Sequence, residues 1–172
     1  ENAGGDVIIT SGRDGGRNNA GSIFLKGSDS AANGGAVSIL SGSSTLNGNG
    51  GDLLMSGGNS TSNNGGSVTL LSGVSSGGVG GSIDILTPSQ VLASGEINLK
   101  SGDSDTQSGN TLIASGRSVS ASSGEVVVRT GEAISGTAGN ILLQGSSGLT
   151  GGSSILLTAG SSKLQGGEVS IE

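Results

Sequence analysis

The chain contains no cysteine, histidine, tryptophan or tyrosine, and it has a single phenylalanine and a single proline. Without cysteine there are no disulfides and no thiolate nucleophile, and without histidine the usual general base and the commonest metal ligand are missing. The lack of tryptophan and tyrosine removes the flat rings on which sugars and single-stranded nucleic acids stack. We therefore expect no cofactor, no metal and no small-molecule substrate.

Positive charge is also scarce. The sequence has seven Lys and Arg residues and thirteen Asp and Glu residues, which gives a net charge of −6. The basic residues form no cluster. Neutralising phosphates requires concentrated positive charge, so a nucleic-acid partner is not expected. No apolar run approaches the roughly 20 residues of a membrane-spanning helix, so none is predicted.

Glycine and serine dominate instead, with 37 Gly and 34 Ser among 172 residues. Such a composition without periodicity is typical of a disordered low-complexity chain, which is one alternative. Against it, a short apolar segment recurs twelve times at spacings of 14 to 16 residues. A short, regular period indicates one structural unit copied along the chain. The segments begin at Val7, Ile23, Val37, Leu53, Val68, Ile83, Ile97, Thr111, Val126, Ile141, Ile155 and Val169.

Each copy has apolar residues at the first and third positions of a four-residue segment, as in Val37-Ser38-Ile39-Leu40. Residues i and i+2 share one face of a β-strand, so this spacing predicts a strand rather than a helix. The third position is always apolar, which predicts an inward-facing series: Ile9, Leu25, Ile39, Met55, Leu70, Ile85, Leu99, Ile113, Val128, Leu143, Leu157 and Ile171.

The connectors between these segments are about ten residues long and nearly equal in length. Equal connectors predict that each carries the chain back to the same starting edge, which gives parallel strands. The expected fold is therefore all-β: a single-stack parallel β-solenoid (β-helix) of about twelve rungs over residues 1–172, an excerpt of a longer array. An antiparallel sheet of hairpins is the competing fold, and it would need alternate connectors to differ. We expect turns with positive φ at Asn33-Gly34, Asn47-Gly48, Asn49-Gly50 and Asn64-Gly65.

The opposite face of the predicted strands is not polar. Ten copies place a large apolar residue there, which is typical of a surface that another molecule covers. The alternative is that part of the same chain covers it. We predict that this face is an interface between copies of the chain, formed by Ile8, Phe24, Leu40, Leu54, Leu71, Leu86, Leu112, Val127, Leu142 and Leu156.

Motifs with specific chemistry are weak. Gly48-Asn49-Gly50-Gly51 lacks the Gly-Lys-Ser/Thr of a phosphate loop. Asp103 and Asp105 share one connector, but two carboxylates fall short of the six or more oxygens that calcium takes. The acids are dispersed, so we do not expect an enzyme. Asn59-Ser60-Thr61 is an N-glycosylation sequon, usable only if the parent protein is secreted by a eukaryotic route.

The unit Gly-x-Val/Ile-x-Ile/Leu-x-Ser/Thr-Gly, over essentially the whole chain, resembles repetitive β-solenoid segments of large secreted or surface proteins. It is similar to filamentous-haemagglutinin-like adhesin arrays and to Gly/Ser repeat proteins of microalgal surfaces, although its period is shorter than the haemagglutinin one. The resemblance implies an extracellular or cell-surface location and a structural or adhesive role. The first hypothesis is a building block of a filament, stalk or adhesin that assembles by repeat stacking and by its outward apolar face. The second is a surface-binding module such as an ice-binding solenoid, for which the threonines are scattered in phase.

Overall fold

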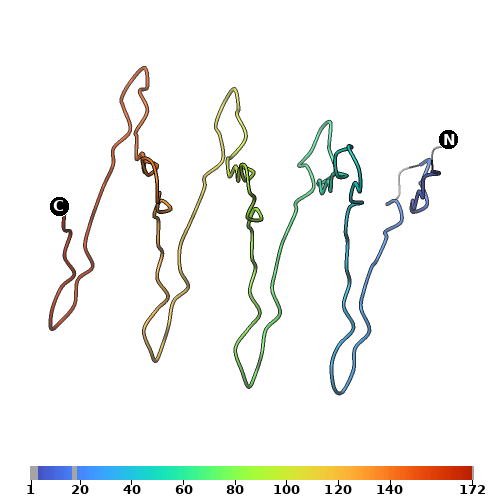
Figure 1. Cartoon of the computed structure of the whole chain (residues 1–172), viewed down its shortest axis with the longest axis horizontal. Helices are drawn as coiled ribbons and strands as arrows, with labels where there is room; N and C mark the ends of the chain where they lie inside the picture. The colour runs from blue at the N-terminus through green and yellow to red at the C-terminus, as the bar shows by residue number, and fades with distance from the viewer. Residues whose placement is uncertain (1–3, 17–18, 172) are drawn as a thin grey trace. The chain divides into compact units, whose positions relative to one another are not determined.

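Extended segments joined by bends make up the chain (Figure 1). The computed structural model describes residues 4–16 and 19–171, so both extremes of the predicted array and residues 17–18 lie outside the described part. Within these ranges there is no helix and no β-strand. The chain divides into two units, Glu1–Leu86 and Thr87–Glu172, which are described separately.

In the first unit, each connector folds back on itself and is closed at its base by one backbone hydrogen bond. The light-blue turn near residue 30 shows the arrangement, with the two arms side by side (Figure 1). Here the N–H of Gly35 donates to the carbonyl of Ser28 at 2.8 Å. Equivalent bonds join Gly21 to Gly12, Gly51 to Gly42, Gly66 to Gly58, and Gly81 to Gly73.

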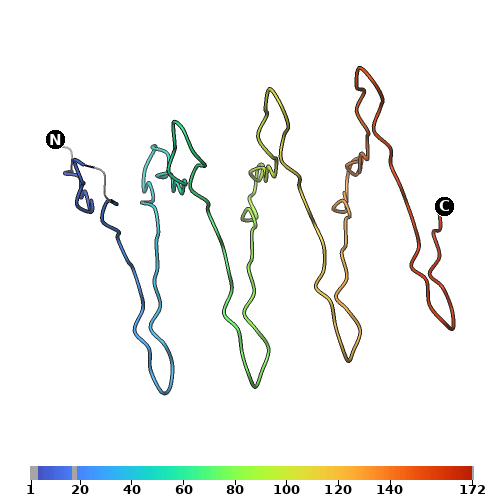
Figure 2. The same ribbon diagram turned by 180° about the vertical axis from the view of Figure 1, so that it is seen from behind.

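The second unit has fewer closed connectors among its described residues. The N–H of Ser153 donates to the carbonyl of Ser146 at 3.0 Å, and the N–H of Gly167 donates to the carbonyl of Gly160 at 2.8 Å. The second of these closes the red turn that precedes the C-terminus (Figure 2). Both connectors reverse the chain locally.

The prediction of a parallel β-solenoid is wrong, because the described residues contain no strand and no rung-to-rung ladder. Seven of the connectors close on themselves instead of travelling back along the strand, and each of these has a single backbone hydrogen bond across its base rather than a series. The antiparallel sheet is absent from the described residues for the same reason. Alternation of apolar residues indicates an extended segment, but pairing also requires neighbouring segments to be held in register.

The predicted inward series is also wrong. No described residue is buried, and Leu70 and Ile85 are 58% and 62% exposed. The apolar residues of the connectors do not pack against the segments either, since Val74 and Leu92 are almost fully exposed. The glycines of the four Asn-Gly dipeptides do not adopt positive φ, so these turns form without left-handed residues.

Candidate self-association surface

The ten residues predicted to form an interface are all strongly exposed. Their exposure ranges from 62% at Val127 to 89% at Phe24. Six of them lie in the unit Glu1–Leu86 and four in the unit Thr87–Glu172. Because each side chain keeps most of its surface in solvent, the members of this outward row do not pack on one another within the chain.

The other face of the same segments is unevenly exposed. Side chains at the first apolar position, such as Ile23, Val68 and Val169, are about half-buried, with Val7 as the exception. Side chains at the third apolar position are 58–88% exposed, which overlaps the range of the outward row. The two faces therefore overlap in exposure, and neither forms a core among the described residues.

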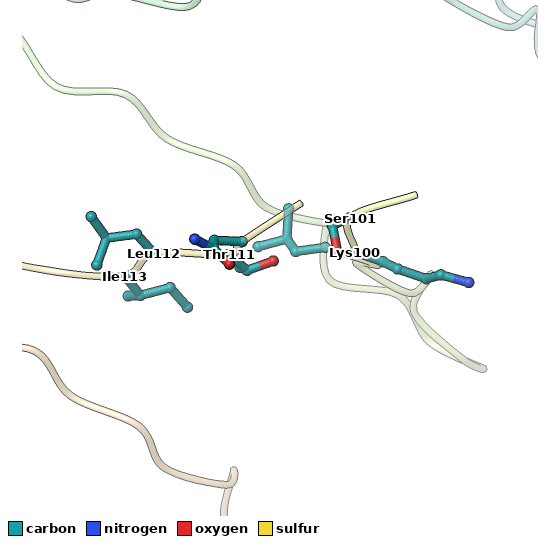
Figure 3. A pocket seen from close by; sticks show the side chains of 7 residues that line it. Lys100, Ser101, Thr111, Leu112 and Ile113 are labelled. Atoms are coloured by element: carbon teal, nitrogen blue, oxygen red, sulfur yellow. The ribbon is translucent and has the colours of Figure 1, made fainter. Parts of the chain in front are cut away.

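A shallow hollow of about 420 Å³ lies between two extended segments of the second unit. It is lined by Leu99, Lys100, Ser101 and residues 110–113. Leu112 and Ile113 project to opposite sides of the chain, and Lys100 extends away from the hollow (Figure 3). Leu112 is the member of the outward row that lines it. No Asp or Glu lines the hollow, and its one charged lining residue, Lys100, is paired with Asp103 outside it. The lining therefore contains no acid and base that face each other, as general acid–base catalysis would need.

Five of the seven partly buried described residues lie at the bases of connectors, directly after the apolar segments, whereas Asp14 and Ser118 lie within connectors. Gly27, Gly57, Thr87, Ser101 and Ala159 are partly buried there, in a chain that is otherwise almost uniformly exposed. A Cβ atom on Gly27 would collide with the carbonyl of Gly35, and one on Gly57 with the carbonyl of Gly66. Only glycine fits at these two positions, because the two arms of the connector pass each other in backbone contact.

Two ion pairs link the end of an apolar segment to its connector. Lys26 Nζ lies 2.7 Å from Asp29 Oδ2, and Lys100 Nζ lies 3.4 Å from Asp103 Oδ2. Both have the same spacing of three residues and both are well exposed, so each contributes little to stability. We did not predict these pairs from the sequence, although the shared Lys-x-x-Asp spacing at equivalent positions of two copies could have indicated them.

The remaining candidate residues lie in exposed connectors. Asp103 is paired with Lys100, and no group of three or more acidic side chains able to hold a metal occurs among the described residues. Asn59 is exposed, and the hydroxyl of the following Ser60 accepts hydrogen bonds from the N–H groups of Ser62 and Asn63. No helix in the described part of the chain is long and apolar enough to cross a membrane.

Comparisons with known proteins add no relative. No family model, no curated protein and no solved structure matches this chain. The function of the chain is therefore inferred from its exposed apolar row, its closed connectors and its large surface area.

Proposed function

We propose that this chain is a structural building block of an extracellular filament, stalk or adhesin, and that it associates with further copies through the outward row. The observation that carries the proposal is the strong exposure of an apolar row that recurs in ten of the twelve segments. Extracellular location is part of the proposal and is supported by the resemblance of the repeat unit to surface proteins. Stacking of rungs within one chain is no part of it.

The surface area of the chain supports association. It exposes 17615 Å². A compact monomer of 16.2 kDa would expose about 7,500 Å². The difference far exceeds the roughly 1,600 Å² that a stable interface buries. The described part of the chain buries no apolar residue, so it lacks the main favourable term that offsets conformational entropy, and contacts with other chains are the available source of that term.

The spacing of the row also favours a second copy as the partner. Ten of the twelve segments carry a large apolar side chain on this face, so two copies present the same pattern to each other. Charged residues are few on this face, and the nearest ion pairs are already internally neutralised, as at Lys26 and Asp29. A repeated pattern of this kind permits addition of further copies, which a filament requires.

The test is the association state of the full chain over a range of concentrations, measured by sedimentation velocity and light scattering. We expect wild type to associate and a variant with Leu54, Val127 and Leu142 changed to Lys to remain monomeric. Burying one Leu contributes about 1.5–3 kcal/mol, so each change should weaken association about tenfold or more.

The matched control changes Val74, Leu92 and Leu164 to Lys. These connector residues are as exposed as the outward row, and the variant adds the same charge. We expect it to associate like wild type. If wild type stays monomeric at high concentration, or if both variants lose association equally, the proposal is wrong. A monomer that instead binds and shapes ice crystals would support the surface-binding hypothesis.

A further inference from the structure

We propose that Asn33, Asn49 and Asn64 are sites of spontaneous conversion to aspartate and isoaspartate, and that Asn47 is protected from it. All four are exposed, precede a glycine and lie in connectors of the first unit. This inference is independent of self-association.

The reacting groups are accessible at three of the four sites. Within the described part of the chain, no hydrogen bond engages the N–H of Gly34, Gly50 or Gly65. Glycine has no Cβ to hinder approach of its nitrogen to the preceding side chain, and its backbone reaches conformations closed to other residues. The amide nitrogen can therefore reach the side-chain carbonyl carbon of the preceding asparagine.

The reaction needs no other reagent than water. The nitrogen of Gly34 loses its proton and forms a bond to Cγ of Asn33, while the bond from Cγ to Nδ2 breaks and ammonia leaves. Water then adds to one of the two carbonyls of the cyclic imide. Opening one side gives aspartate, and opening the other gives isoaspartate, in which the backbone passes through the side-chain carbons.

Asn47 differs because its nucleophile is already engaged. The N–H of Gly48 donates to Ser44 Oγ at 3.1 Å, and this bond must break before the nitrogen can attack. We expect conversion at Asn47 to be about fivefold slower than at the other three sites, the factor that a net hydrogen bond of about 1 kcal/mol gives.

The three reactive sites share one place in their connectors. Each asparagine lies two residues before the glycine whose N–H closes the base of the connector: Gly35, Gly51 or Gly66. Isoaspartate lengthens the backbone two residues before the closing glycine and adds a negative charge. The modification should therefore weaken the closing bond as well as change the charge of the first unit.

To test this, the full chain is incubated at mildly alkaline pH, and conversion of each asparagine is followed by peptide mass mapping. Fragmentation of the peptides distinguishes aspartate from isoaspartate. Asn140, which precedes the β-branched Ile141, serves as the internal slow reference. The variant Ser44→Ala releases the N–H of Gly48. We expect fast conversion at the three sites, slow conversion at Asn47, and acceleration of Asn47 alone, about fivefold, in Ser44→Ala.

Either of two results overturns the proposal. One is conversion of Asn33, Asn49 and Asn64 no faster than that of Asn140. The other is an Asn47 that reacts in wild type as fast as its neighbours, or that does not respond to Ser44→Ala. Neither result depends on whether the chain associates.

Discussion

The two units of the chain carry the same repeat, yet their connectors close differently. All five connectors between the apolar segments of Glu1–Leu86 have a backbone hydrogen bond across the base, whereas two of the six in Thr87–Glu172 have one, as judged from the described residues. The difference is not one of loop length. In closed and open connectors alike, seven to nine residues separate the donor position from the acceptor position at the base.

The two units differ in the residue that directly precedes the donor of the closing hydrogen bond. A glycine precedes the bonded residue in six of the seven closed connectors, as in Gly34-Gly35 and Gly80-Gly81. The four open connectors have a residue with a side chain there: Ser94, Ser108, Ser123 and Ala138.

Crowding of the acceptor oxygen would contribute at some of these connectors. A Cβ atom on Gly80 would lie 3.3 Å from the carbonyl oxygen of Gly73, and one on Gly65 would lie 3.4 Å from that of Gly58. These are the oxygens that accept the closing bonds. At Gly34, Gly50 and Gly152 the same distance is 3.7–3.8 Å, which is an ordinary contact, so a side chain would crowd the acceptor at some connectors and not at others.

One closed connector departs from the pattern, since Ala20 precedes Gly21. Its base has a second bond, from Ser11 Oγ to the carbonyl of Gly21 at 2.8 Å. This bond gives the base a second closing contact besides the backbone one. The closed state thus depends on a small balance, which substitutions should shift in a predictable order.

The largest effect is expected at the glycines where the two arms touch. The change Gly57→Ala places a methyl group against the carbonyl of Gly66, and overpacking of this kind costs about 1–3 kcal/mol. The amide of Gly66, which donates the closing bond, should then exchange its hydrogen about five to a hundred times faster. Amide hydrogen exchange followed by NMR measures this directly.

Gly58→Ala is the matched control, because a Cβ atom there meets nothing within 4 Å. We expect the exchange of the Gly66 amide to change little in this variant. Equal acceleration in the two variants would show that backbone stiffness, and not contact between the arms, governs closure.

An intermediate effect is expected from exchanging the residue that distinguishes the two units. Gly80→Ser should weaken the closing bond of the first unit, and Ser123→Gly should let Gly124 donate to Gly116 in the second. Both connectors span eight residues between these groups, so loop length is held constant. A bond worth about 0.5–1.5 kcal/mol predicts a change in amide exchange of about two- to tenfold, opposite in sign at Gly81 and Gly124. If the amide of Gly124 gains no protection, the glycine pair is not the deciding feature.

Part of this arrangement could be predicted from the sequence. The bends at residues 31–32, 61–63 and 119–121 fall in connectors, as the recurrence of Val, Ile and Leu predicts. The exposure of Leu70 and Ile85 could not be predicted in this way. Apolar residues at every second position specify one face of an extended segment, but they do not specify whether anything covers that face.

The sequence contains signals for the closed connectors, but these signals were taken to predict a different path of the chain. Equal connector lengths suggested a return path along the strand, whereas the glycines at both ends of a connector allow it to close on itself. The contact of Gly27 with the carbonyl of Gly35 depends on backbone atoms alone, and no side-chain pattern indicates it. Such local closure competes with long-range pairing, since it has the smaller loop entropy to overcome.

The smallest effect concerns the ion pairs, one in each unit. Lys26 and Asp29 lie beside a closed base, whose acceptor is the carbonyl of Ser28, whereas Lys100 and Asp103 lie beside an open one. Lys26→Met keeps most of the side-chain stem and removes the charge, so it should speed exchange of the Gly35 amide by about twofold at most, as exposed pairs contribute about 0.2–1 kcal/mol at low salt. High salt should erase the difference between wild type and variant, because the Debye length falls to about 3 Å at 1 M. Lys100→Met should leave the Gly109 amide unchanged, since that amide has no closing bond to lose. A response at Gly109 equal to that at Gly35 would mean that the ion pairs act on the connectors generally, and that closure of the base does not separate the two units.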